Sequence, residues 1–192
     1  MATYSDVLRI AEAELVSHVQ EVPLGSNAGP RVEKYLKSVC LPAGNPWCAA
    51  FVNWCMVAGD IVGWPATGDT WAIRDWANER GVYSTNPLVG DVFLELDNKG
   101  DPLHTGFVKA VGPTTWDSIE GNFGDRVYTQ SRYFAGFKFV HWQSVLLQTA
   151  RYLNIYSHDG SHAFTMDGAT TSVKGIKVNG VPFAGGTIVV GY

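Results

Sequence analysis

The chain has 192 residues, of which 46% are hydrophobic and 12% aromatic; this is enough apolar material for a full core, so a disordered protein is excluded. A formal net charge of -4 at pH 7 argues against nucleic-acid binding and supplies no basic patch for an anionic surface. No apolar run approaches about 18 residues, and the N-terminus lacks the charged and apolar regions of a signal peptide. We therefore expect no membrane span, and synthesis in the cytoplasm without Sec export.

The first half of the chain has apolar residues at helical spacing. Residues 4–20 predict an amphipathic helix, and residues 31–39 resume the same period after a loop rich in Gly and Pro. A third helix is expected over 46–58, and a fourth over 70–81, with Asp69 as its cap.

From Val92 onward the apolar period shortens to two, which is typical of strands. Turn residues separate the predicted strands, which cover 92–96, 105–111, 116–120, 127–131 and 137–142. Helices followed by a sheet, with the helices packed on that sheet, indicate an α+β fold.

Cys48 is the first candidate for a catalytic residue because it falls in the first turn of the third predicted helix. Asn45 suits the N-cap of that helix and Pro46 its first position. Free backbone N–H groups and the helix dipole at such a position favour a thiolate. The alternative is a buried structural cysteine, which is the role we expect for Cys40 and Cys55.

A base and an orienting group follow in the order that a cysteine nucleophile needs. His104 begins a β-prone run, and Glu120 and Asn122 follow two residues apart on the next strand. Because strand side chains alternate, both should point to one face, and either could orient the imidazole. Cysteine, histidine, then an acid or amide is the papain-like order.

Trp47-Cys48, His104 and the Glu120-x-Asn122 pair together resemble the CHAP family of cysteine- and histidine-dependent amidohydrolases and peptidases, over roughly residues 20–142. The resemblance implies a papain-like fold with the nucleophile at a helix start on an antiparallel sheet. It also implies hydrolysis of an amide bond in peptidoglycan, with Cys48, His104, Glu120 and Asn122 as the catalytic residues.

The resemblance leaves several settings open for a chain without an export signal. It could be a phage lysin, a phage tail component or a delivered effector, with an immunity protein or a phage structural protein as partner. The alternatives are an intracellular amidase acting on a small peptide-like substrate and a catalytically silent wall-binding or structural protein.

Substrate contacts are predicted next to the nucleophile. Trp47 is expected in the substrate groove, and the amides of Asn27 and Asn45 could donate to an oxyanion. The other aromatic candidates, Trp71, Trp76 and Tyr128, are expected in the core. We expect no cofactor and no metal, because the Cys and His spacings match no zinc pattern.

The last fifty residues match nothing in the hydrolase pattern. Glycines separate short β-prone runs such as 176–178 and 187–190. We therefore expect two parts: a catalytic domain at residues 1–142 and a small β-rich extension or subdomain at 143–192. The extension could bind the wall or a partner, or could extend the core sheet.

Overall fold

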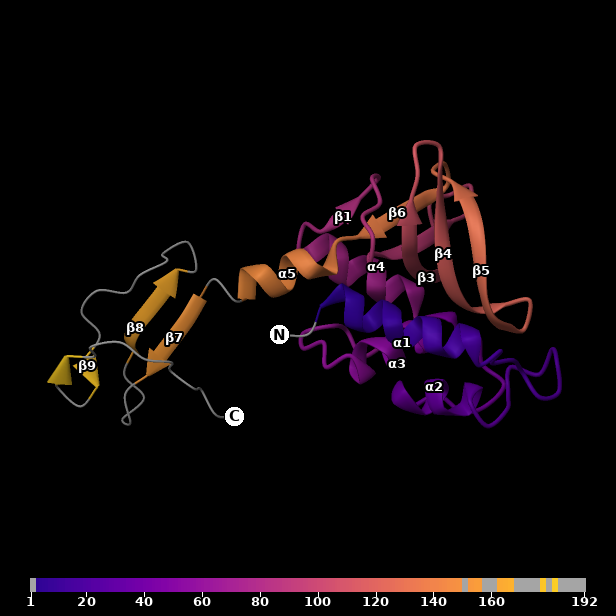
Figure 1. Ribbon diagram of the computed structural model, residues 1–192, viewed down its shortest axis with the longest axis horizontal. Coiled ribbons are helices and arrows are strands. Elements are labelled where there is room, and N and C mark those ends of the chain that lie inside the picture. The colour runs from indigo at the N-terminus through magenta and orange to yellow at the C-terminus, as the bar shows by residue number, and fades with distance from the viewer. Residues whose placement is uncertain (1–2, 150–151, 157–161, 168–176, 179–180, 183–192) are drawn as a thin grey trace. The chain divides into compact units, whose positions relative to one another are not determined.

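The computed structural model describes residues 3–149, 152–156, 162–167, 177–178 and 181–182 (Figure 1). The chain divides into two compact units, Met1–Leu146 and Leu147–Tyr192. The division falls within α5 (Trp142–Thr149), later in the chain than the boundary predicted after residue 142.

Four helices precede the sheet of the first unit: α1 (Tyr4–Val16), α2 (Val32–Ser38), α3 (Cys48–Ala58) and α4 (Thr70–Glu79). A capping box begins α1, in which the Thr3 N–H donates to Asp6 at 2.9 Å. At the start of α4, the Asp69 carboxylate accepts from the Trp71 N–H at 2.9 Å, as the sequence predicts. By contrast, α3 is apolar around most of its circumference, because it is the central, buried helix.

Six antiparallel strands form one sheet in the order β1-β6-β2-β3-β4-β5. Their bounds are β1 (Tyr83–Ser84), β2 (Val92–Leu96), β3 (Pro102–Val111), β4 (Thr115–Phe123), β5 (Arg126–Tyr133) and β6 (Phe137–Val140). Helices α1 and α3 contact β4 and the strands beside it, and α4 contacts β3 and β1 (Figure 1). The fold is therefore α+β with N-terminal helices packed on an antiparallel sheet, as predicted.

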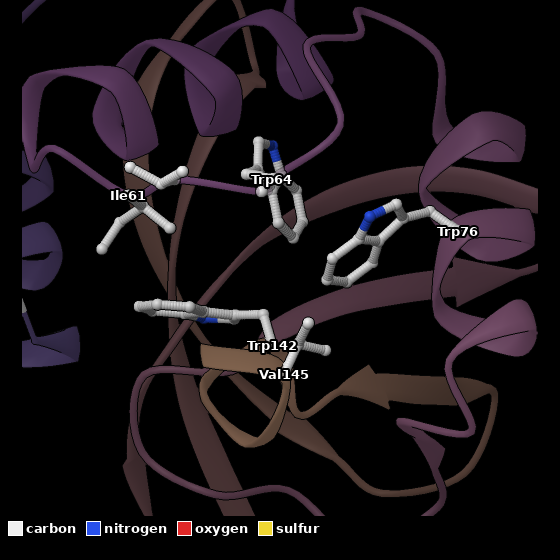
Figure 2. A pocket seen from close by; sticks show the side chains of 7 residues that line it. Ile61, Trp64, Trp76, Trp142 and Val145 are labelled. Carbon is white, nitrogen blue, oxygen red and sulfur yellow. The ribbon is translucent and has the colours of Figure 1, made fainter. Parts of the chain in front are cut away.

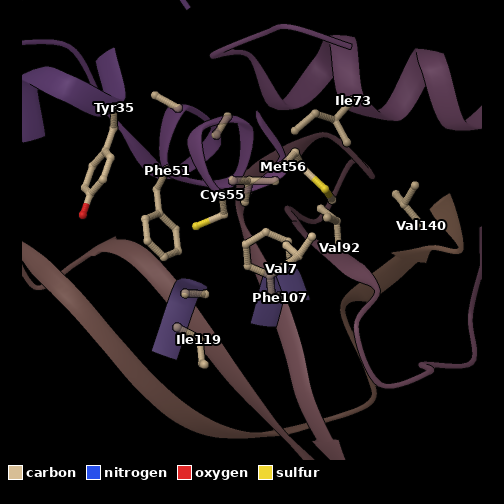
Figure 3. Close-up of a cluster of buried hydrophobic side chains, with 14 of the residues drawn as sticks. Val7, Tyr35, Phe51, Cys55, Met56, Ile73, Val92, Phe107, Ile119 and Val140 are labelled. Carbon is tan, nitrogen blue, oxygen red and sulfur yellow. The ribbon is translucent and has the colours of Figure 1, made fainter. Parts of the chain in front are cut away.

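Each face of the sheet carries its own apolar cluster because the strand side chains alternate. Phe107 and Ile119 face the helices and pack with Phe51 of α3 in the main core (Figure 3). On the other face, a smaller aromatic cluster contains Phe93, Val108, Trp116 and Phe139.

The start of α5 is fixed to the first unit. Trp142 is buried, and its indole N–H donates to the Gly90 carbonyl at 2.7 Å. Around it, Ile61, Trp64 and Trp76 line a small apolar pocket of about 10 Å³ (Figure 2). Trp76 is therefore a core residue, as predicted.

In the second unit, the described strands are β7 (Tyr152–Tyr156), β8 (His162–Asp167), β9 (Lys177–Val178) and β10 (Val181–Pro182). These described strands pair with one another, β7 with β8 and β9 with β10. The predicted strand at 187–190 lies outside the described residues. Of the helices in the described ranges, none combines the length and the hydropathy of a bilayer span.

Candidate active site

Cys48 is the first residue of α3, so the nucleophile position predicted from the sequence is retained although its local cause differs. The helix begins at Cys48, with Trp47 as N-cap, and not at Pro46. Asn45 is not the cap: its side-chain amide donates to the Pro42 carbonyl at 3.0 Å and closes a turn. The backbone N–H groups of the first helical turn nevertheless remain available beside the thiol.

His104 lies near the start of β3, where it contacts both expected partners of an acid–base group. Its Nε2 atom hydrogen bonds Glu120 Oε2 at 2.8 Å, and the imidazole also hydrogen bonds the Cys48 thiol. The His104 side chain is 17% exposed and the Glu120 side chain 0%. The structure therefore brings Cys48, His104 and Glu120 into one hydrogen-bonded array.

The Glu120 carboxylate is held by two further side chains that the sequence analysis did not identify. Arg132 of β5 donates from Nε to Oε1 at 2.8 Å and from Nη2 to Oε2 at 2.7 Å. The Ser118 hydroxyl, two residues back on β4, also donates to Oε1. Together with His104, these donors satisfy the fully buried carboxylate.

The electrostatics of the array favour charge on both partners. Burial alone would raise the pKa of Glu120, but the hydrogen bonds from His104, Arg132 and Ser118 outweigh burial and lower it. Burial alone would lower the pKa of His104, but its hydrogen bonds with Cys48 and Glu120 raise it to about 9. An imidazolium beside a carboxylate is thus the favoured state at neutral pH.

Asn122 occupies a different position from Glu120, although both lie on β4. The pairing of β4 with β5 shifts between Glu120 and Phe123, where β4 has one residue more than its partner, as in a β-bulge. Asn122 adopts a left-handed φ of 61° there and makes no hydrogen bond to His104. The strict alternation that made the two residues equivalent is interrupted, and the imidazole is paired with Glu120.

Gly121 explains how the helix start comes so close to the strand. A Cβ atom at this position would lie 2.6 Å from Phe51 Cβ and 2.8 Å from Trp47 Cζ3. Only a glycine allows β4 to approach α3 this closely, immediately beside Glu120. The glycine therefore sets the distance between the thiol on the helix and the acid–base pair on the sheet.

Cys48 opens onto a groove of about 550 Å³. The groove is formed by the loop before α3, the segment before α4 and the start of β3. Besides Cys48, the residues that line it are Val39, Leu41, Asn45, Pro46, Ala66, Thr67, Gly68, Asp69, Thr70 and Leu103. Asn45 thus lines the same groove as Cys48. Asn27 is not among these groove residues; its backbone links two loops, accepting from the Gly44 N–H at 2.9 Å and donating to Glu21 at 2.8 Å.

The predicted roles of the aromatic residues are partly reversed. Trp47 has no exposed surface: its indole donates to the buried carboxylate of Glu21 at 2.8 Å, and its ring stacks on Tyr35. Its assignment to the substrate groove is wrong, because the residue before a buried helix start is covered by the core. Trp71 and Tyr128, expected in the core, are each 42% exposed.

Two functional neighbours of Glu120 were missed for a simple reason. The predicted fourth strand ended at Ser131, one residue before Arg132, whereas β5 continues to Tyr133. In the observed register Arg132 is opposite Trp116, and Ser118 is two residues before Glu120 on the same strand. Period-two alternation along β4 was the available signal for Ser118.

Among the described residues, no group of three or more His, Cys, Asp or Glu side chains could hold a metal ion.

Comparison with known proteins identifies one family. The family model of the CHAP domain matches residues 41–122, a range that contains Cys48, His104, Glu120 and Asn122. No curated protein and no solved structure matched the chain in the same comparison. Residues 41–122 therefore match the CHAP domain, a papain-like family whose members are typically cysteine amidohydrolases or peptidases.

Proposed function

We propose that this protein hydrolyses an amide bond of bacterial peptidoglycan through a thiol mechanism. The bond is either the muramoyl-alanine bond or a peptide bond within the stem peptide or cross-bridge. The observation that carries the proposal is the hydrogen-bonded array of Cys48, His104 and Glu120 beside an open groove. The CHAP match supports a peptidoglycan substrate.

In the proposed chemistry, His104 already holds its proton as the imidazolium at neutral pH and pairs with the Cys48 thiolate, which is the attacking form. Because Nε2 of the imidazole is paired with Glu120, Nδ1 is the nitrogen left for the thiol. The thiolate attacks the carbonyl carbon, and the Cys48 N–H at the helix start donates to the oxyanion, with the Asn45 amide as a second candidate donor. His104 then protonates the departing amine. Water, deprotonated by His104, hydrolyses the thioester and releases the acid.

We propose that the protein acts on the wall after release or delivery, as a phage lysin, a phage tail component or an effector, with an immunity protein or a phage structural protein as its partner. Residues 143–192 are proposed as a separate small β-rich element whose role is open between targeting and packing.

The decisive test is digestion of purified peptidoglycan by the full chain and by Cys48→Ala. We expect the wild type to release soluble fragments and Cys48→Ala to release none, because the substitution removes the nucleophile. Cys40→Ala is the matched control, since Cys40 is an exposed free thiol that is not a member of the hydrogen-bonded array. Mass spectrometry of the fragments identifies the cleaved bond by which new amine and carboxylate appear.

Other outcomes of this experiment would contradict the proposal. Wall digestion by Cys48→Ala would remove Cys48 from the mechanism. An intact wall, combined with cleavage of small γ-glutamyl or peptide-like amides, would identify an amidase of small substrates. Slow alkylation of Cys48 at neutral pH, without any hydrolysis, would indicate a silent structural or wall-binding protein.

A further inference from the structure

Arg132 is mostly buried and is held in place by several contacts with the acid–base array. Its side chain is 14% exposed, and its guanidinium is paired with both oxygens of Glu120. The third nitrogen, Nη1, lies 3.3 Å from Glu95 Oε2 on β2. The guanidinium also packs over the rings of Phe93, Phe123 and Phe137 at 5.6, 5.5 and 5.2 Å. It is thus confined by two carboxylates and three aromatic rings.

These contacts leave the Glu120 carboxylate no free acceptor position. It accepts two hydrogen bonds from Arg132, one from Ser118 and one from His104, and a carboxylate offers about four lone-pair sites. The planar fork of an arginine fixes the plane of the carboxylate as well as its charge, which a lysine cannot do. The orientation of the oxygen that meets His104 Nε2 is therefore set from the far side by Arg132.

The charge balance of the array is consistent with this arrangement. The charged and titratable groups that meet here come from four strands and one helix: Glu95 of β2, His104 of β3, Glu120 of β4, Arg132 of β5 and Cys48 of α3. Two carboxylates and one guanidinium carry one net negative charge, which favours a positive charge on the imidazole, and a thiolate at Cys48 adds a second negative charge beside it. Without Arg132, the two carboxylates would meet no permanent cation in this array.

We propose that Arg132 is a positioning residue that acts through Glu120. It keeps Glu120 ionised and in one orientation, so that His104 retains its Nε2 proton and presents Nδ1 to Cys48. The inference deepens the proposed function because it concerns the same array. It requires the Cys48–His104 pair but not a wall substrate, so the two can fail separately.

The test measures the alkylation rate of Cys48 by iodoacetamide against pH, in the full chain carrying Cys40→Ala so that the exposed second thiol does not react. The key variant is Arg132→Met, which keeps an apolar side chain against the three rings. Loss of the guanidinium should let Glu120 take a proton at higher pH and weaken the imidazolium that supports the thiolate. We expect the acid-side midpoint of the rate profile to move up by about one pH unit or more.

Arg31→Met is the matched control. Arg31 also pairs with a buried carboxylate, Glu14, and also packs over an aromatic ring, Trp54, but neither residue contacts Cys48 or His104. We expect this variant to unfold at lower temperature with an unchanged alkylation midpoint. If Arg132→Met likewise melts at lower temperature but keeps the alkylation midpoint of the wild type, the inference is overturned, because Arg132 then has a structural role only.

Arg132→Lys keeps the test decisive if the methionine variant does not fold. A lysine retains the charge but not the fork, so we expect a midpoint shifted less than in Arg132→Met and a maximal alkylation rate lowered by about threefold or more. A lysine variant identical to the wild type in midpoint and rate would overturn positioning by the fork. Parallel peptidoglycan digestion reports on the proposed function alone: alkylation shifts with no wall cleavage by the wild type would keep the inference and reject the substrate.

Discussion

Among the residues that the structure describes, two buried carboxylate–guanidinium clusters share the same design, one between helices and one between strands. In the helical cluster, Glu14 of α1 accepts from Arg31 and from the Tyr35 hydroxyl of α2. In the strand cluster, Glu120 accepts from Arg132 and from the Ser118 hydroxyl. Both guanidinium groups pack over aromatic rings.

The clusters differ in one further neighbour. Glu120 also hydrogen bonds His104, which hydrogen bonds Cys48. The side chains that donate to Glu14 are Arg31 and Tyr35, and neither of them is an imidazole. The helical cluster thus joins α1 to α2 and serves packing, while the strand cluster transmits its negative charge to an imidazole. The comparison teaches that, under the proposed function, a buried ion pair takes part in catalysis because of the titratable group beside it.

Equivalent substitutions in the two carboxylates should have the largest and most different effects. Glu120→Gln should lower kcat on peptidoglycan by about 10²-fold or more, because an amide stabilises the imidazolium poorly. Glu14→Gln should lower the free energy of unfolding by about 1–3 kcal/mol but leave kcat per folded molecule unchanged. Urea unfolding and initial rates measure both. Equal losses of kcat in the two variants would show that the clusters do not differ as described.

The strand cluster acts only if α3 is held against it, which Gly121→Ala tests. The added methyl group would overlap Phe51 and Trp47, so we expect a loss of about 1–3 kcal/mol in stability and slower Cys48 alkylation. Gly124→Ala is the control: its φ is +56°, and a Cβ atom there would have no heavy atom within 4 Å apart from those of its chain neighbours. Only backbone strain of about 1 kcal/mol is therefore expected. Normal alkylation in a destabilised Gly121→Ala protein would separate the helix approach from the chemistry.

The pH dependence should also distinguish the clusters. Since the pKa of His104 is raised to about 9, kcat/KM should fall as the pH rises through that value and the imidazolium acid is lost. The same group stabilises the fold fully below its ordinary value of 6.5, and this contribution is lost as the pH rises towards about 9. The helical cluster should not titrate in this window. Burial and Glu14 raise the pKa of Tyr35, and hydrogen bonds from Arg31 and Tyr35 outweigh burial to lower that of Glu14.

Unfolding free energies of the wild type and His104→Gln, measured between pH 6 and 10, check the stability part of this prediction. Their difference should shrink over the alkaline half of the range. The difference between the wild type and Glu14→Gln should stay constant there. A constant difference for His104→Gln would mean that its pKa is not raised in the folded protein.

The smallest effect is expected at Asn122. Glycine accepts the left-handed φ of 61° without strain, so Asn122→Gly removes the side chain alone. Because His104 is paired with Glu120, we expect kcat/KM to fall by less than about tenfold, well short of the loss in Glu120→Gln. A loss as large as that in Glu120→Gln would transfer the orienting role to Asn122.

Residues that act through local geometry could be predicted from the sequence alone. The Asp69 cap and the alternating strands follow from cap chemistry and periodicity over a few residues. Periodicity also places Cys48 in the first turn of a helix, although Asn45 is not the cap of that helix. The CHAP resemblance rested on short motifs of this kind. The α+β order of helices and strands also follows, because each element is encoded by its own segment.

Tertiary packing decided what the local patterns leave open. The position of Trp47 next to Cys48 predicts a groove residue. Trp47 is nevertheless buried, because Glu21 and Tyr35, which are distant in sequence, cover it. Arg132 becomes part of the site only through the β4–β5 register, and Asn122 leaves the array through a bulge in that same register. Period and propensity determine which face a side chain takes within its own element. Which residue it meets depends on how separate elements pack, and that information is spread over the whole chain.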